Sequence, residues 1–333
     1  MKILVTGAAG FIGSKAAQTL GHLGHTVVAL DNFNDYYSPG LKRARVDNLL
    51  KPLGIEVQNI NISDIKRIRE LISNEQPHVI LHLAAQAGVR LPPDQIHKYV
   101  QSNIVGYSNM LQVAIQFEIP NFIYASSSSV YGNSQNFPYK EKDLVLSPVS
   151  FYGATKLANE LLAPTLIRNS NTKARGLRFF TVYGPWGRPD MAYFRLINAG
   201  VNKGVFDLFG DGNIVRDFTF IDDVIVAIVR LINDLENRIF GFHDIVNIAG
   251  GKPASLQEMI SEISSQLNET ISINKLEMHN NDVNHTSADT NYLKSLITDI
   301  PSISLRDGLS KVISWAKDPN NSLMLEKWVK SSI

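Results

Sequence analysis

The sequence feature that most constrains the fold is a glycine-rich run directly after the first apolar segment. Residues Lys2–Thr6 are apolar enough for a buried strand, and Gly7, Gly10 and Gly13 then form a G-x-x-G-x-x-G run that opens a helix-length segment. Glycine allows a tight turn at the first position, backbone approach to a pyrophosphate at the second, and close helix–strand packing at the third. The amino end of the helix would add unpaired N–H groups and positive dipole. The sequence therefore predicts a dinucleotide-binding turn.

Strand-like and helix-length segments alternate through the first half of the chain. Runs such as Val27–Leu30 are continuously apolar, which is typical of strands covered on both faces by helices. This alternation predicts an α/β fold with a doubly wound parallel sheet of the Rossmann type. The expected elements are Lys2–Thr6, Phe11–Leu23, Thr26–Leu30, Glu56–Ile60, Ile65–Ser73, Val79–Leu83, a helical stretch over about Asp94–Glu118, Asn121–Ser126, Tyr152–Arg168 and Lys173–Thr181.

The alternation ends after Gly184-Pro185, where short strands and helices become mixed. We expect residues 1–183 to form the nucleotide-binding domain and 184–333 to form a smaller α/β ligand-binding domain, with some segments returning to the first. The elements expected there are strands at Asp207–Phe209, Asp244–Ile248 and Ile271–Lys275, and helices at Ile221–Asn233, Ser255–Gln266 and Leu305–Trp315.

Composition narrows the classes of partner and compartment. The 32 basic and 31 acidic residues give a net charge of +1, so no global field favours nucleic acid or an anionic membrane. There is no cysteine, which excludes disulfides, thiolate metal sites and a cysteine nucleophile and agrees with a reducing compartment. No apolar run approaches the length of a membrane span, and no His, Asp or Glu spacing suggests a metal site. We expect a soluble, cytoplasmic protein.

A carboxylate at the end of the second strand selects the dinucleotide. Asp31 follows Gly13 by 18 residues, where it can accept hydrogen bonds from adenosine ribose hydroxyls and repel a 2′-phosphate. NAD is therefore expected rather than NADP, against the alternative that Asp31 is a solvated turn residue. Asp64 fits two roles equally well, a helix cap or an adenine contact.

Two groups of polar residues supply a proton-transfer site. Tyr152 and Lys156 stand four residues apart on one helix face, where the ammonium would favour the phenolate and make it a competent base. This spacing alone is common on helix surfaces. Ser126–Ser129, however, leave the ligand edge of the sheet just before Val130-Tyr131-Gly132, and so many hydroxyls are costly to bury without partners. Together they favour a catalytic site over a serine-rich turn.

These segments, with Leu83-Ala84-Ala85 and Arg216-Asp217-Phe218, resemble the extended short-chain dehydrogenase/reductase family over essentially the whole chain. The resemblance implies a Rossmann-type fold, a retained NAD and a catalytic triad of Ser127, Tyr152 and Lys156. The NAD contacts that it implies are Gly7, Gly10, Phe11, Ile12, Gly13, Asp31, Asn32, Asp64, Ile65, Leu83, Ala84, Ala85, Tyr152 and Lys156.

The residues before Val130 separate the reactions that this family catalyses. Nucleotide-sugar dehydratases carry an Asp-Glu pair there and UDP-glucuronate decarboxylases carry Glu, whereas this chain has Ser128 and Ser129. With no carboxyl group to assist elimination, return of the hydride, which is epimerisation, is the simplest outcome. Residues 31–37, 84–90 and 184–191 further resemble the UDP-glucuronate 4-epimerases, which implies UDP-glucuronate as substrate and UDP-galacturonate as product.

That resemblance also implies the substrate contacts. Ser128, Ser129 and Thr181 would surround the sugar carboxylate. Arg188 and Arg216 would face the UDP portion, with Arg216 the better candidate for the diphosphate, although Arg188 could instead form a surface salt bridge and Thr181 could be a plain strand-end hydroxyl. Asp282 would bind the uridine ribose. The family usually has Gln-Pro-Gly before that aspartate, whereas this chain has His279-Asn280-Asn281.

Other readings of the same residues stay open. One is a 4-epimerase of another UDP-hexose, one is a UDP-glucuronate decarboxylase, and one is a catalytically silent, NAD-binding regulatory protein. The intact triad favours an enzyme. We expect no nucleic-acid or membrane partner, and a homodimer in which the helices near Asp94–Glu118 and Tyr152–Arg168 pair with their symmetry mates.

Overall fold

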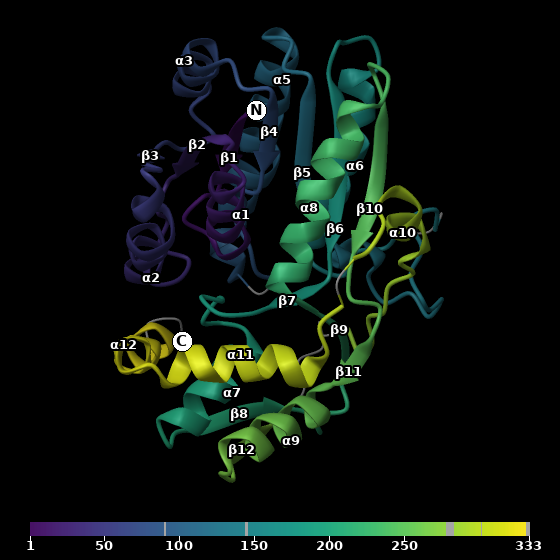
Figure 1. The fold of residues 1–333 in the computed structure, drawn as a ribbon. Helices are drawn as coiled ribbons and strands as arrows, with labels where there is room; N and C mark the ends of the chain where they lie inside the picture. The colour runs from purple at the N-terminus through teal and green to yellow at the C-terminus, as the bar shows by residue number, and fades with distance from the viewer. Residues whose placement is uncertain (90, 144–145, 278–282, 301, 331–333) are drawn as a thin grey trace.

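A computed structural model describes residues 1–89, 91–143, 146–277, 283–300 and 302–330. Its first layer is a seven-stranded sheet in the order β10-β6-β5-β4-β1-β2-β3, in which all neighbouring strands are parallel (Figure 1). The sheet strands are β1 (Lys2–Thr6), β2 (Thr26–Asp31), β3 (Val57–Asn59), β4 (Val79–His82), β5 (Asn121–Ser127), β6 (Lys173–Phe179) and β10 (His243–Ile248). The doubly wound Rossmann-type fold expected from the alternation is confirmed.

Helices cover both faces of this sheet, which explains the continuously apolar strands. Ile3 and Val5 of β1 belong to one core with α1 and α8, whereas Leu4 belongs to a second core with α3, α5 and α6. Both faces therefore bury apolar side chains. The covering helices are α1 (Phe11–His22), α8 (Ile221–Glu236), α3 (Ile65–Glu75), α5 (Tyr107–Gln116) and α6 (Phe151–Ile167).

The helix expected over about Asp94–Glu118 is interrupted. It consists of a 3-10 turn at Pro93–Gln95, α4 (Ile96–Tyr99), a π-helical stretch at Val100–Gly106, and α5. Asn103 lies in the π-helical stretch. Its Oδ1 accepts from the backbone N–H of Gln86 at 2.8 Å, and its Nδ2 donates to the backbone carbonyl of Gln86 at 3.1 Å. The wider turn thus holds the loop after β4.

The second group of elements lies below the sheet, against the carboxyl ends of its strands (Figure 1). The strand expected at Lys173–Thr181 ends at Phe179, because the chain changes sheets there and continues as β7. A three-stranded sheet has the order β11-β9-β7, and a two-stranded sheet pairs β12 with β8. Its elements are β7 (Thr181–Tyr183), α7 (Ala192–Val201), β8 (Val205–Phe209), β9 (Val215–Phe220), β11 (Pro253–Ser255), α9 (Leu256–Leu267), β12 (Ser272–Leu276), α11 (Leu305–Lys317) and α12 (Pro319–Lys330).

Elements from beyond residue 184 return to the large sheet. Strand β10 pairs with β6, and α8 packs beside α1, so the two groups interleave along the chain. The remaining short elements are α2 (Pro39–Arg45), a π-helical turn (Val46–Leu50), 3-10 turns at Lys51–Leu53 and Ser128–Tyr131, and α10 (Asn291–Leu296). Among the described helices, none has the length and apolarity to cross a membrane.

Candidate active site

The glycine run forms a turn in which side chains do not fit. Gly7 has a φ of 72°, and a Cβ there would lie 2.8 Å from the backbone nitrogen of Ala84. A Cβ on Gly13 would lie 2.1 Å from the carbonyl oxygen of Gly7, and one on Gly10 would lie 2.9 Å from the same atom. The start of α1, with Phe11 and Ile12, therefore lies directly against the turn and leaves a backbone-lined cradle suited to a pyrophosphate.

The carboxylate of Asp31 is tied to this turn. Asp31 is buried, and its Oδ2 accepts from the backbone N–H of Ala9 at 3.1 Å while its Oδ1 accepts from that of Phe33 at 2.7 Å. Asn32 follows it and is exposed. The two backbone donors fix the carboxylate at the mouth of the cradle, where the ribose contact was expected.

The other expected cofactor residues lie at the ends of neighbouring strands. The backbone N–H groups of Leu83 and Ala84 donate to Thr6, at 3.2 Å to its carbonyl and 3.1 Å to its hydroxyl, which brings the segment ending in Ala85 against the glycine turn. Asp64 caps α3, because its Oδ1 accepts from the N–H of Arg67 at 3.2 Å, and Ile65 follows it. A contact of Asp64 with adenine stays a prediction.

Ser127, Tyr152 and Lys156 come together at the carboxyl end of β5. The Ser150 hydroxyl caps α6 by accepting from the N–H of Gly153 at 3.1 Å, so the helix begins directly before Tyr152. Lys156 Nζ donates to the carbonyl of Ala125 at 2.8 Å and lies 5.8 Å from the ring centre of Tyr152. The arrangement places the ammonium and the phenol on one side of the serine run.

The electrostatic setting of this group depends on burial. Burial raises the pKa of the Tyr152 phenol above its ordinary value, and the Arg188 guanidinium and the Ser127 hydroxyl oppose that rise. Burial lowers the pKa of Lys156 to about 8, and Glu160 opposes that fall. Positive charge beside Tyr152 is what a phenolate at neutral pH requires, and Arg188 supplies part of it.

Arg188 is anchored by residues that the sequence analysis did not single out. Its Nε donates to Asp190 Oδ1 at 3.0 Å, and the hydroxyl of Tyr36 donates to the other carboxylate oxygen at 3.2 Å. The guanidinium carbon lies 5.7 Å from the ring centre of Tyr36. Although burial disfavours its charge, the Asp190 carboxylate raises the pKa of Arg188. The Arg-Pro-Asp spacing was the available signal for this pair.

The residues expected around the substrate lie at the same edge of the large sheet. Ser127 pairs with Phe179 at the ends of β5 and β6, so Ser128, Ser129 and Thr181 all lie one or two residues beyond those strand ends. The hydroxyl of Ser127 donates to that of Ser129 at 3.1 Å.

Arg216 lies further from this edge, on β9. It is half-buried, and its Nη1 donates to the carbonyl of Val215 at 2.9 Å. Asp282, expected at the uridine ribose, lies outside the described residues.

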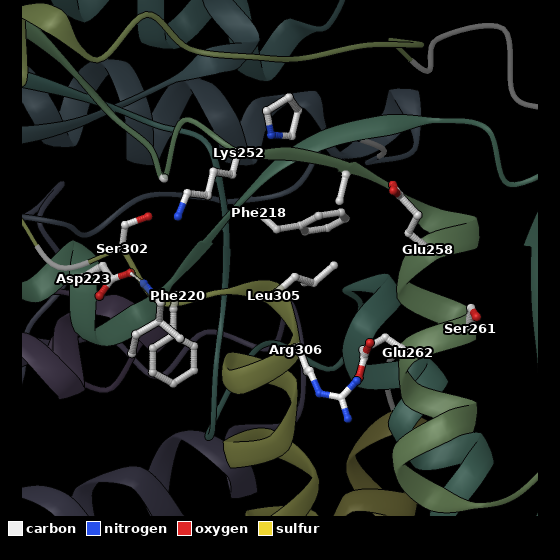
Figure 2. A pocket seen from close by; sticks show the side chains of 14 residues that line it. Phe218, Phe220, Asp223, Lys252, Glu258, Ser261, Glu262, Ser302, Leu305 and Arg306 are labelled. Atoms are coloured by element: carbon white, nitrogen blue, oxygen red, sulfur yellow. Dashed lines mark hydrogen bonds and ion pairs between the residues drawn. The ribbon is translucent and has the colours of Figure 1, made fainter.

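A separate hollow lies between the ends of β9 and β11, α9 and the start of α11 (Figure 2). It has a volume of about 450 Å³, an apolar floor of Phe218, Phe220 and Leu305, and a rim that includes Lys252, Glu258 and Arg306. None of the triad or glycine-turn residues lines it. The hollow is therefore distinct from the candidate active site.

Known proteins resemble the chain over nearly its full length. Residues 3–249 match the model of the NAD dependent epimerase/dehydratase family. The protein CapI of Staphylococcus aureus is 39% identical over 95% of this chain and 98% of its own, and UDP-glucuronate 4-epimerase 4 of Arabidopsis thaliana is 37% identical over 94% and 74%. The crystal structure of UDP-glucuronic acid 4-epimerase from Bacillus cereus with UDP-glucuronic acid and NAD covers 95% of this chain and 99% of that one, with 34% identity and a TM-score of 0.87. This protein belongs to the NAD dependent epimerase/dehydratase family.

Proposed function

We propose that this protein is an isomerase that inverts C4 of UDP-glucuronate to give UDP-galacturonate, with NAD as cofactor and a 4-keto intermediate. The observation that carries the proposal is that Ser127, Tyr152 and Lys156 lie close together at the end of β5. Positions 128 and 129, where elimination would need carboxyl groups, are both serine. The likeness to the Bacillus cereus epimerase over 95% of the chain supports the substrate.

The described residues fit NAD. The glycine turn excludes side chains at three positions, and Asp31 is held at its mouth as an acceptor for ribose hydroxyls and a repellent for a 2′-phosphate. We assign Leu83–Ala85, Tyr152 and Lys156 to the nicotinamide half of the cofactor. Residues 1–183 would then be mainly the NAD-binding domain and 184–333 mainly the UDP-sugar-binding domain, apart from α8 and β10.

In the proposed mechanism, Tyr152 acts as the base and then as the acid. As phenolate it accepts the proton of the sugar O4, and Ser127 hydrogen-bonds the same oxygen. When bound, NAD supplies the acceptor and later the donor of the C4 hydride. The charge of Arg188 favours the phenolate, and Lys156, whose Nζ lies 5.8 Å from the ring centre of Tyr152, would add positive charge beside it. After the keto sugar turns about its diphosphate link and presents its other face, Tyr152 returns the proton to O4.

The sugar carboxylate needs its own holder, because a 4-keto-uronate is a β-keto acid. Such an acid loses carbon dioxide when its C–COO⁻ bond stands perpendicular to the carbonyl plane. We assign Ser128, Ser129 and Thr181 to holding this carboxylate near the plane, since neutral hydroxyl donors bind it without promoting its loss. Arg216 and Asp282 would hold the diphosphate and the uridine ribose.

Thr181→Ala is expected to divert part of the keto intermediate. A hydrogen bond from a neutral donor to a charged group contributes about 1.5–3 kcal/mol, which would shift the partition between return and decarboxylation by about one to two powers of ten. The products, followed by NMR, should then include a UDP-4-keto-pentose, and the protein should accumulate NADH absorbance. Lower turnover with neither product nor NADH would show that Thr181 only positions the ring.

The proposed function is tested by NMR of UDP-glucuronate incubated with the purified protein. Inversion at C4 supports it, a pentose product would indicate the decarboxylase, and inversion of UDP-glucose at an equal rate would indicate a general UDP-hexose epimerase. No reaction, together with no change in absorbance at the NADH band with any UDP-sugar, would indicate the silent regulatory protein.

A cytoplasmic location stays a prediction.

We also propose a homodimer formed through α6 and the interrupted helix beside it. On α6, Phe151, Leu161 and Leu166 are 44%, 64% and 45% exposed, and Val100 and Val105 of the π-helical stretch are 38% and 37% exposed. An apolar face of this kind on two adjacent helices is typical of an interface between subunits.

Leu161→Glu is therefore expected to convert the dimer into a monomer, because a charge would be buried at the centre of that face. Light scattering at micromolar concentration measures the change. Leu23→Glu is the matched control, since Leu23 is 56% exposed at the end of α1 on another face, and it should leave the mass unchanged. A monomeric unmutated protein would contradict the proposal.

A further inference from the structure

A buried charged pair, Glu160 and Arg178, lies next to the proposed triad. Glu160 is one helical turn after Lys156 on α6, and Arg178 is on β6. Arg178 donates to both carboxylate oxygens of Glu160, from Nε at 2.9 Å and from Nη2 at 2.7 Å. Glu160 is 6% exposed and Arg178 is 2% exposed. A buried pair adds little net stability, since the loss of hydration offsets most of its attraction, so its location suggests another role.

The carboxylate of Glu160 also holds the serine run. The hydroxyl of Ser126 donates to Glu160 Oε1 at 2.5 Å. Ser126 lies opposite Arg178 in the register of β5 and β6, so both side chains leave the same face of the sheet and meet Glu160 there. Ser126 and Ser127 are consecutive residues of β5, and their side chains point to opposite faces of the sheet. Holding the Ser126 side chain therefore also holds the backbone that presents Ser127.

Arg178 extends this network to the Val-Tyr-Gly motif. Its guanidinium carbon lies 4.7 Å from the ring centre of Tyr131, and the Tyr131 hydroxyl donates to Asn247 Oδ1 at 2.8 Å. Asn247 belongs to β10, the strand that returns to the sheet. Tyr131 thus packs against Arg178, the residue that holds Glu160. This contact gives Tyr131 a structural role, whereas the proposed chemistry assigns it none.

Glu160 is also the carboxylate that acts on Lys156. Burial lowers the pKa of Lys156 to about 8, and the Glu160 charge opposes that fall. Two other titratable groups of the described residues interact with Lys156: Tyr152 on the same helix, and His82 on β4, whose pKa burial lowers to about 3. His82 is therefore neutral at physiological pH and does not favour the ammonium.

We propose that Glu160 is a positioning residue of the reaction, which fixes the serine run through Ser126 and places a carboxylate one helical turn from Lys156. Arg178 holds the Glu160 carboxylate in its orientation through the two hydrogen bonds. This inference rests on the proposed roles of Tyr152 and Lys156. Glu160 touches neither the substrate nor the cofactor in this scheme. It acts on the reaction through Ser127, by way of Ser126, and through Lys156.

Glu160→Gln tests the charge. Without the negative charge, the pKa of Lys156 falls further, so the ammonium is lost at a lower pH. The alkaline limb of turnover against pH should then move down by about one pH unit, because an opposite charge one helical turn away changes a pKa by about one unit. Turnover in the plateau where Lys156 is an ammonium should change less than turnover above pH 8.

Asp244→Asn is the matched control. Asp244, on β10, forms a bidentate pair with Arg175, a buried arginine on β6 like Arg178, with both distances at 2.7 Å, and it contacts neither Lys156 nor the serine run. If Glu160 only supported the fold, both variants would lower the melting temperature and leave the alkaline limb in place. That result would overturn the proposal.

Ser126→Ala tests the second arm and is small enough to fold if Glu160→Gln does not. It should lower kcat without moving the alkaline limb and with little change in KM, because it releases Ser127 but keeps the Glu160 charge. An unchanged kcat would contradict the claim that Glu160 positions the serine run through Ser126. An unmutated protein that does not invert C4 would instead remove the proposed function, so the two failures are distinguishable.

Discussion

Tyr152→Phe is expected to lose nearly all turnover while it keeps NAD and the UDP-sugar bound. The substitution removes one hydroxyl and leaves the ring, which packs 6.2 Å from the ring of Tyr99, in place. General acid–base catalysis contributes about 10²- to 10⁴-fold, so kcat should fall by that factor with little change in KM. Turnover by NMR and the NAD content of the purified protein measure the two parts of this expectation.

Tyr183→Phe is the control for that experiment. The Tyr183 hydroxyl lies on β7 and donates to the carbonyl of Ser304 at 3.5 Å, at the outer limit of a hydrogen bond, so its loss should leave turnover nearly unchanged. Near-normal turnover of Tyr152→Phe would mean that a different group accepts the O4 proton. Loss of bound NAD in Tyr152→Phe would mean that the hydroxyl holds the cofactor instead.

Gly13→Ala is expected to abolish cofactor retention and to destabilise the fold. A Cβ at this position would lie 2.1 Å from the carbonyl oxygen of Gly7 and 2.8 Å from its carbonyl carbon, both backbone atoms that cannot rotate away. The start of α1 would have to move from the turn that forms the cradle. Overpacking of this kind costs about 1–3 kcal/mol, and the displaced N–H groups would no longer converge on a pyrophosphate.

NAD content after purification and the melting temperature measure the effect of Gly13→Ala. The matched control is Gly204→Ala, because a Cβ there would meet only Ala199 Cα at an ordinary 3.7 Å. The control should retain NAD and the melting temperature of the unmutated protein. If Gly13→Ala also retained NAD, the glycine turn would not be the pyrophosphate site.

Much of the large sheet could be predicted from the sequence. Its strands are short apolar runs, because both faces are covered, and its turns are marked by glycine and serine, so β1, β2, β4 and β5 were predicted to within about two residues of their observed bounds. The second half gave weaker signals. Strands β9 and β11 and helices α7 and α12 were not predicted, although α7 buries Tyr193, Phe194 and Ile197 at helical spacing.

The sequence by itself determined the chemistry that can occur, because the glycine turn, Asp31, the serine run and the Tyr152–Lys156 spacing are local patterns with local causes. Only the tertiary structure decided what surrounds them. Asp190 and Tyr36 hold Arg188, and Glu160 binds both Arg178 and Ser126, through contacts between residues far apart in the chain. Burial alters the pKa values of Tyr152 and Lys156, and burial is a property of packing that no local pattern records.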